Sequence, residues 1–323
     1  MRRREFIALM GASVTWPFAA LAQEPGRTYR LGVLFAGPRS GDVVTAFFEG
    51  VRRQGFIEGQ NLTVIYHALG INPDLLPEWV AELVKARVDV IAVAGNSAIR
   101  AAQGATKTIP ILAITDDMLG TGLVNSLARP NGNTTGVSVL ATELDGKRQE
   151  LLIEAVPDLH RMAALADSNM TRAMKLDELE DAAREQNIEL SIYRVARREE
   201  IPATIETAQA SGATALNVLA SAMLWGNRQL IMDQVAALRL PTMYEWPETA
   251  EEGGFVGYGP RLRDIFRDVL PRQLTQLFQG VRVADIPVEQ PTKFELVINL
   301  KTANALGVTV PATLVARADK VIE

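Results

Sequence analysis

The sequence predicts an α/β protein made of two similar Rossmann-like lobes joined by a multi-strand hinge. Two observations carry this prediction. Short apolar runs rich in β-formers alternate with segments whose apolar residues recur at helical spacing, which is typical of parallel α/β folds. The same order of strands and helices then occurs a second time within the 323 residues, which indicates a repeated lobe.

The first lobe opens with an apolar run at 29–36, which predicts a strand. In the helix expected next, at 41–55, Val44, Phe47 and Val51 recur at the spacing of one apolar face. The other elements expected in this half are strands at 61–68, 88–95 and 109–115 and helices at 73–87 and 97–105.

The second lobe repeats this order at a nearly constant distance along the chain. Arg161 follows Arg30 by 131 residues, and Pro241 follows Pro110 by 131. A period this long indicates a duplicated lobe rather than a solenoid. The elements expected here are strands at 160–167, 188–196, 213–221 and 240–245 and helices at 171–187, 199–212 and 223–239.

The segments that pass between the lobes are predicted at places where the two halves of the repeat do not match. One passage leads into a helix at 142–157, which Thr142 is expected to cap. A second follows the run at 253–260, because the helix after it has no counterpart in the first half. A hinge between two lobes leaves a cleft. The expected lobes are 28–139 with about 259–290, and 140–258 with about 291–323.

The first 22 residues have the pattern of a secretory signal peptide. Three arginines precede an apolar stretch, and Ala20-Leu21-Ala22 provides a cleavage site before Gln23. The order Arg3-Arg4-Glu5-Phe6-Ile7 favours twin-arginine export. The apolar stretch is shorter than the roughly 20 residues that span a bilayer. We therefore expect a periplasmic protein cleaved after Ala22.

Composition narrows the class of the mature protein. The chain is 48% hydrophobic and has a net charge of −5, without the basic face of a nucleic-acid binder. Loss of the leader removes three arginines and one glutamate, so the net charge becomes −7. There is no cysteine for a disulfide or a lipid anchor, and no later segment is expected to span a membrane.

Candidate ligand-binding residues follow from the rule that ligands of open parallel sheets lie beyond the carboxyl ends of the strands. In the first half the rule selects Phe35, Gly37, Gly95, Asn96, Ser97, Thr115, Asp116 and Asp117. In the second half it selects Ser168, Asn169, Ser221, Tyr244, Glu245 and Trp246, with Tyr258 at a hinge crossing.

These residue types suit a small solute with polar ends. Gly95 allows close approach to the backbone, and Ser97 is expected to cap a helix whose free N–H groups favour an anion. A plain cap without a ligand is the alternative. One of Asp116 and Asp117 could accept an ammonium group, with a solvated turn as the alternative. Aromatic residues among the candidates, with Met118 and Met170, could wall an apolar slot.

Catalytic and metal-binding patterns are missing from the sequence. His67 and His160 have no second ligand at metal-binding spacing, and no nucleophile-elbow, phosphate-loop or dinucleotide motif is present. We expect no cofactor, no metal and no enzymatic activity. A carboxylate-based enzyme stays open as an alternative, because missing motifs alone do not exclude an active site.

Several segments together resemble a large bacterial family, the TrpX-like substrate-binding proteins of ABC transporters. The resemblance lies in the leader and in the stretches AFFEGVRRQGFIEGQNLTVIY, SLARPNGNTTGVS, ELDGKRQELLIEAVPDLHRMAAL and FELVINLKTANALGV. It covers nearly the whole mature chain. It implies the type I periplasmic-binding-protein fold, with closure of two lobes on a small solute.

The resemblance also implies partners, namely an ABC permease and an ATPase, and some members of the family bind aromatic amino acids. A periplasmic sensor that feeds a receptor is the alternative role. The turns at Gly95-Asn96-Ser97, Asp116-Asp117 and Ser168-Asn169 depart from the family's usual Gly-Thr-Pro, Asp-Pro and Asn-Pro. Because these turns are expected to line the cleft, the solute does not transfer from a relative. We expect a carboxylate-bearing solute, with an aromatic or other apolar amino acid as the leading candidate.

Overall fold

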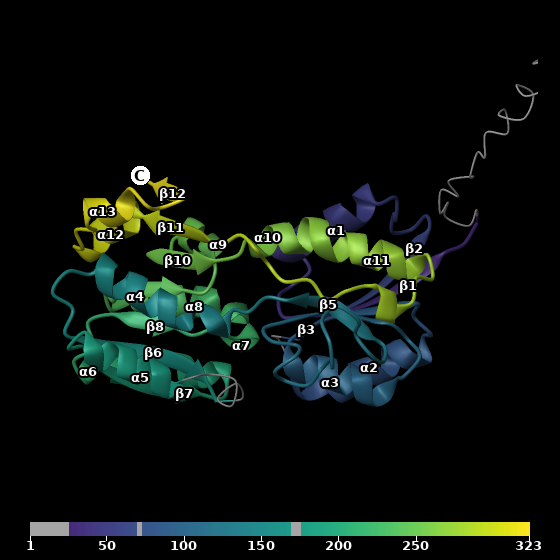
Figure 1. Ribbon diagram of the computed structural model, residues 1–323, viewed down its shortest axis with the longest axis horizontal. Helices are drawn as coiled ribbons and strands as arrows, with labels where there is room; N and C mark the ends of the chain where they lie inside the picture. The colour runs from purple at the N-terminus through teal and green to yellow at the C-terminus, as the bar shows by residue number, and fades with distance from the viewer. Residues whose placement is uncertain (1–25, 70–72, 169–175) are drawn as a thin grey trace, which may run out of the picture.

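The computed structural model describes residues 26–69, 73–168 and 176–323 and has two lobes, each built on its own sheet (Figure 1). The first sheet has the strand order β2-β1-β3-β4-β5, and the second has the order β12-β11-β10-β9-β8-β6-β7. The signal peptide expected at 1–22 and the candidate residue Asn169 lie outside the described residues.

The first sheet is parallel in all four strand pairs, and its strands alternate with helices as the sequence predicts. Its strands are β1 (Tyr29–Phe35), β2 (Leu62–Ala68), β3 (Val90–Ala94), β4 (Ile111–Thr115) and β5 (Thr134–Ser138). The helices of this half are α1 (Asp42–Arg53), η1 (Pro73–Leu75), α2 (Leu76–Lys85) and α3 (Asn96–Ala105).

The second sheet repeats the parallel order and then adds strands from the C-terminal part. The pair β10/β11 is antiparallel, whereas the other five pairs are parallel. Its strands are β6 (Arg161–Asp167), β7 (Glu189–Val195), β8 (Leu216–Val218), β9 (Thr242–Tyr244), β10 (Val256–Gly259), β11 (Glu295–Asn299) and β12 (Lys320–Ile322).

The helices of the second half and the tail complete the two lobes. They are η2 (Thr142–Leu144), α4 (Asp145–Ala155), α5 (Leu176–Glu185), η3 (Arg198–Glu200), α6 (Ile201–Ala210), α7 (Ala222–Gly226), α8 (Arg228–Ala237) and α9 (Pro247–Glu251). After β10 follow α10 (Leu262–Asp264), the π-helical η4 (Ile265–Val269), α11 (Leu270–Phe278), η5 (Val283–Asp285), α12 (Leu300–Leu306) and α13 (Ala312–Val315).

The internal repeat holds at the level of single hydrogen bonds. The carbonyl of Pro110 accepts from the N–H of Ile91 at 2.9 Å, and the carbonyl of Pro241 accepts from Leu216 at 2.9 Å. In both lobes this proline immediately precedes a strand, β4 in the first sheet and β9 in the second. The offset seen in the sequence therefore reflects equivalent places in two sheets.

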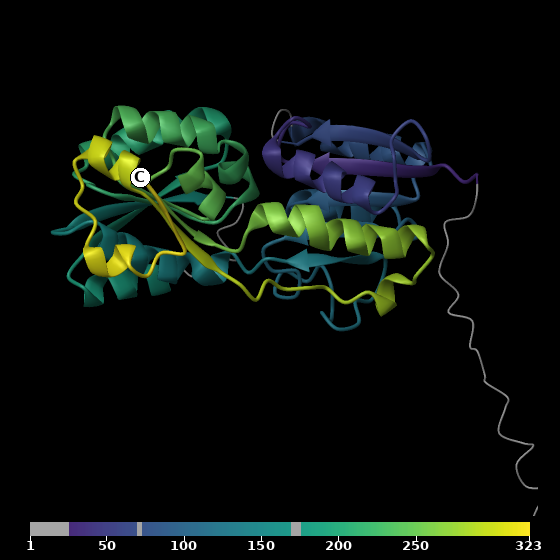
Figure 2. The same ribbon diagram turned by 90° about the horizontal axis from the view of Figure 1, so that it is seen from above.

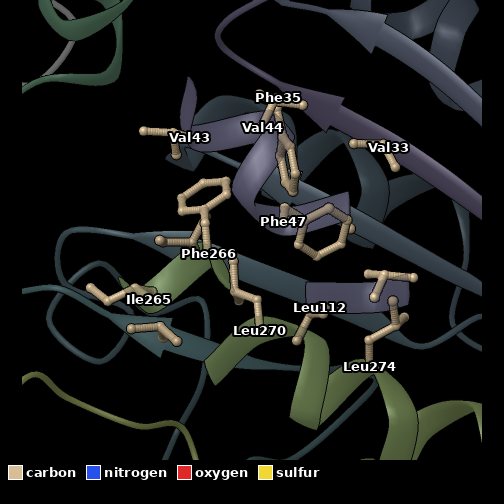
Figure 3. Packing of buried hydrophobic residues seen from close by; sticks show 14 of the residues in the cluster. Val33, Phe35, Val43, Val44, Phe47, Leu112, Ile265, Phe266, Leu270 and Leu274 are labelled. Carbon is tan, nitrogen blue, oxygen red and sulfur yellow. The ribbon is translucent and has the colours of Figure 1, made fainter. Parts of the chain in front are cut away.

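The segment from α10 to α11 returns to the first lobe and packs along α1 (Figure 2). The approach is close at Gly50, where an added Cβ would lie 2.1 Å from the carbonyl oxygen of Arg267, so only glycine fits. Phe266 then reaches Phe35 and Phe47, with ring centroids 5.1 and 6.4 Å away (Figure 3). This aromatic core anchors the segment to the first sheet.

Candidate functional site

The carboxyl ends of β1 and β3 meet the second lobe at α7. A Cβ placed on Gly95 would lie 3.5 Å from the Cβ of Ala222, and one placed on Gly226 would lie 3.9 Å from that of Ala36. The strand ends that the sequence singled out in the first lobe thus lie against the other lobe. This arrangement puts the turn at Gly95 beside the junction of the lobes.

The turn after β3 places Gly95, which has no side chain to cap with, at the N-cap of α3. Gly95 has a φ of 89° and is itself the N-cap residue, so the helix begins at Asn96. The expectation that Ser97 caps the helix is wrong, because Ser97 lies inside the first turn and is exposed. The side chain of Asn96 is held by Thr115, whose hydroxyl donates to Asn96 Oδ1 at 2.6 Å. The start of α3 thus brings backbone N–H groups and the positive end of the helix dipole to the side of the lobe junction, a setting that suits an anion.

Both aspartates after β4 already accept hydrogen bonds from protein groups. Asp116 is buried and accepts from the N–H of Thr142 at 2.8 Å and from its hydroxyl. The expected cap of Thr142 on its own helix is therefore wrong, since its side chain serves Asp116 instead. Asp117 is half-buried and accepts from the N–H groups of Leu119 and Gly120 at 3.0 and 2.8 Å.

In the second lobe Ser221 does what was expected of Ser97. It is the N-cap of α7, and its hydroxyl oxygen accepts from Met223 and Leu224. The same hydroxyl donates to Asp167 Oδ2 at 2.7 Å. Ser168 follows β6, is exposed and donates its N–H to Val195 at 2.9 Å. The polar turn of this lobe is thus anchored at Asp167 and Ser221.

The aromatic candidates are mostly committed to the packed interior. Phe35 lies in the core of the first lobe and Tyr244 in that of the second, each 2% exposed. Trp246 is buried and packs with the first-lobe core. Tyr258 is half-buried, 6.5 Å from the ring of Phe294. Gly37 follows β1, and its carbonyl accepts from the Tyr66 hydroxyl at 2.5 Å.

A buried arginine, which the sequence reasoning missed, joins the passages between the lobes. Arg148 on α4 is fully buried and pairs with Asp145 at 2.8 Å. It also donates to the carbonyls of Ala141 at 2.6 Å, Tyr258 at 2.7 Å and Glu245 at 3.0 Å. Ala141 precedes η2 in one passage, and Tyr258 stands just before another. Arg148 therefore ties together segments that are distant in sequence.

Three carboxyl groups surround this guanidinium, and burial dominates the pKa of each. Burial raises the pKa of Asp145 to about 7 despite the attraction of Arg148. Burial also raises the pKa of Glu245 to about 8, against the same attraction and with further elevation from Asp145. The pKa of Asp116 is raised by burial and partly restored by its bonds to Thr142. Burial at the junction therefore favours the protonated form of each carboxyl group more than water does.

One signal in the sequence could have found this cluster. Asp145, Arg148, Gln149 and Leu152 recur at i, i+3, i+4 and i+7, and all four are buried. Polar residues on the buried face of a helix are costly unless they have partners, so this stripe points to a polar network. The hydrogen bonds of this network join protein groups to one another, so we assign the network a structural role.

No metal site or membrane span is found in the part of the chain that the structure describes. No cluster of three or more His, Asp or Glu side chains among the described residues could hold a metal ion. Likewise, none of the described helices is long and apolar enough to cross a membrane.

The comparison with known families decides what these two lobes are. The family model for ABC transporter substrate-binding proteins matches residues 32–322. The chain belongs to this family. ABC transporter substrate-binding proteins bind solutes and are not enzymes, so the alternative of a carboxylate-based enzyme falls away. The resemblance noted in the sequence is confirmed.

Individual relatives of this substrate-binding protein agree with the family assignment. A tyrosine-binding protein of Clostridioides difficile strain R20291 is 24% identical over 267 residues, which cover 80% of this chain and 75% of the relative. This relative thus aligns over most of the two lobes.

Solved structures confirm the two-lobe α/β fold. A conserved domain protein from Vibrio cholerae has a TM-score of 0.81 at 22% identity, covering 91% of this chain and 100% of that one. An ABC domain from Streptococcus pneumoniae in complex with L-Trp has a TM-score of 0.77 at 22% identity, covering 90% and 100%. A ligand-free, open substrate-binding protein from Clostridium difficile has a TM-score of 0.60 at 18% identity, covering 91% and 99%.

Proposed function

We propose that this protein is the periplasmic solute-binding component of an ABC importer and that it captures an aromatic amino acid between its lobes. Family membership supports the transport role, and the tyrosine-binding and L-Trp-bound relatives support the solute class. The leader at 1–22, with its twin arginines and Ala-Leu-Ala site, supports export and cleavage after Ala22. The partners are a permease and an ATPase.

The observation that carries the ligand chemistry is the position of the start of α3, whose glycine cap Gly95 lies beside the lobe junction. A helix N-terminus carries a partial positive charge and free N–H donors, which suit a carboxylate. Asn96 is oriented by Thr115, and Ser97 presents its hydroxyl at the same turn. Ser168 would close over this carboxylate from the other lobe.

The ammonium group of the solute would pair with Asp117. Of the two neighbouring carboxylates, Asp116 is buried and bonded to Thr142. Asp117 is the half-buried one, and its carboxylate accepts from the N–H groups of Leu119 and Gly120 in its own turn. A carboxylate accepts up to about four hydrogen bonds, so Asp117 keeps capacity for a further donor.

The lobe boundaries belong to the same proposal. The lobes are 28–139 with about 259–290, and 140–258 with about 291–323. Membership of β1–β5 in one sheet and β6–β12 in the other supports this division, as does the packing of α11 on α1. The passages near Ala141 and Tyr258, which Arg148 ties together, would act as the hinge.

Native mass spectrometry of protein purified without denaturation tests the solute class. An aromatic amino acid that co-purifies, with an affinity on the order of micromolar, is the expected result. A sugar, a nucleoside or a metal complex in its place would refute the proposed class. A receptor gene beside this one, without permease and ATPase genes, would instead support the sensor role.

A further inference from the structure

We propose that the short helix α7 is the stop that sets how closely the two lobes approach, through a face made of Ala222 and Gly226. This inference rests on the proposed function, in which the lobes close on a solute. It goes further by naming the residues that fix the closed distance and thereby the affinity.

One face of α7 meets two neighbouring strand ends of the first lobe. Ala222 and Gly226 are four residues apart, so they lie on the same side of the helix. Their counterparts, Gly95 and Ala36, follow β3 and β1, which are hydrogen-bonded neighbours in the first sheet. The Cβ of Ala222 is 3.5 Å from the position of a Cβ on Gly95. A Cβ on Gly226 would lie 3.7 Å from the carbonyl oxygen of Ala36 and 3.9 Å from its Cβ.

Residues on both sides of this face hold the helix in place. Ser221 caps it and is itself bonded to Asp167 at the end of β6. Towards the hinge, Ala220 is buried with the core of the first lobe, and Trp225 packs against that core. Trp225 also lies edge-on to Trp246, with centroids 6.3 Å apart. α7 is therefore anchored to the second lobe at Ser221 and packs on the first-lobe core through Trp225.

The contact between this face of α7 and the first lobe is made of small residues and is open to solvent. Ala222 and Gly226 are both exposed, so the contact at this face is made at the surface and not inside a core. Separations of 3.5–3.9 Å are already van der Waals contact. A longer side chain on this face would therefore meet the first lobe before the lobes reach the same distance.

A cross-link tests the contact without any solute. The chain has no cysteine, so the double variant Ala36→Cys/Gly226→Cys carries the only two thiols. The 3.9 Å between the Cβ positions lies within the roughly 3.5–4.5 Å of disulfides, and neither backbone is left-handed. The control pair is Ala36→Cys/Gly104→Cys, because a Cβ on Gly104 has no described atom within 4 Å.

Mild oxidation should cross-link the 36/226 pair, seen as the loss of two hydrogens in the intact mass, while the control pair stays reduced. We expect Ala222→Leu to slow this cross-link roughly tenfold, because overpacking holds the lobes apart. Gly104→Leu, placed in the same 36/226 background, should leave the rate unchanged. Failure of the 36/226 pair to cross-link faster than the control pair would overturn the proposal, and so would an unchanged rate with Ala222→Leu.

Calorimetry with L-tryptophan and L-tyrosine on the same variants separates the two proposals. If these probes bind, Ala222→Leu should weaken their binding roughly tenfold, in step with the slower cross-link. Unchanged affinity alongside a slower cross-link would refute the claim that the stop sets affinity. If neither probe binds the unmodified protein but the cross-link behaves as expected, the stop stands and the proposed solute fails.

Discussion

Arg148 Nη2 donates to the carbonyl oxygen of Glu245 at 3.0 Å, although the two residues are 97 positions apart. The bond joins the helix that follows the first passage to the turn after β9. The same guanidinium, which is fully buried, pairs with Asp145 and also donates to the carbonyl groups of Ala141 and Tyr258. One buried cation thus ties together the segments of the proposed hinge.

Removing that cation should be far more costly than removing a similar one on the surface. Arg148→Met leaves Asp145 buried without its partner, which typically costs about 3–5 kcal/mol of unfolding free energy. The matched control is Arg184→Met, since Arg184 pairs with Asp181 at the same i,i+3 spacing on a helix but both side chains are exposed. The control should lose no more than about 1 kcal/mol. Urea unfolding of both variants gives the comparison, and equal losses would contradict this account of the hinge.

Stability should fall as the pH rises from about 4.5 to about 8. The folded pKa of Glu245 is about 8, above the ordinary 4.5, so the folded state holds a proton that the unfolded chain releases in this window. Asp145, with a folded pKa of about 7, acts in the same direction. Glu245→Gln should therefore flatten the decline measured by urea unfolding at several pH values. Glu150→Gln, on the exposed side of α4, is the control, and a slope that both variants share with the parent would refute the assignment.

The hydroxyl of Ser97 should matter for binding but not for folding. It lies exposed in the first turn of α3 and caps nothing, so Ser97→Ala should leave the melting temperature unchanged. Loss of a hydrogen bond to a charged carboxylate typically costs about 1.5–3 kcal/mol, which weakens binding roughly tenfold or more. Ser211→Ala, at the end of α6, is the control. Calorimetry with wild-type affinity for Ser97→Ala would remove this turn from the site.

The charge of Asp117 should distinguish amino acids from simple carboxylic acids. Asp117→Asn keeps an oxygen that can accept from Leu119 and Gly120, so the turn should persist while the charge is lost. Binding of L-tryptophan should weaken, whereas binding of indole-3-propionate, which lacks the amine, should not change. Equal losses for the two compounds, or none for either, would argue against an ion pair at this position.

The repeat made most of the fold predictable, because parallel α/β lobes follow from local periodicity. Pro110 and Pro241 accept equivalent hydrogen bonds in the two sheets, as the offset between them predicts. The turn at Gly95 lies where the end of a strand was expected. Alternation along β1 explains why Phe35 joins Val33 in the core, and this period-two rule could have kept it out of the cleft.

The caps and the hinge were harder to predict, since they depend on contacts between distant segments. Ser97 failed as a cap because Gly95, with its positive φ, starts the helix one residue earlier than expected. The prediction that Thr142 caps its helix was wrong because its hydroxyl donates to the buried Asp116, which lies 26 residues away in sequence. The partners of Arg148 lie on three separate segments, and no local pattern names them.

The central claim is that an aromatic amino acid binds between the lobes through its carboxylate at the start of α3. The most direct measurement is isothermal titration calorimetry of the mature protein with L-tryptophan and L-tyrosine. As a comparison, L-tryptophan amide lacks the carboxylate charge. We expect one of the two amino acids to bind with a 1:1 stoichiometry and a Kd on the order of micromolar, and the amide to bind at least tenfold more weakly. Absence of binding by both amino acids, or an amide that binds as tightly as its parent acid, would contradict the account.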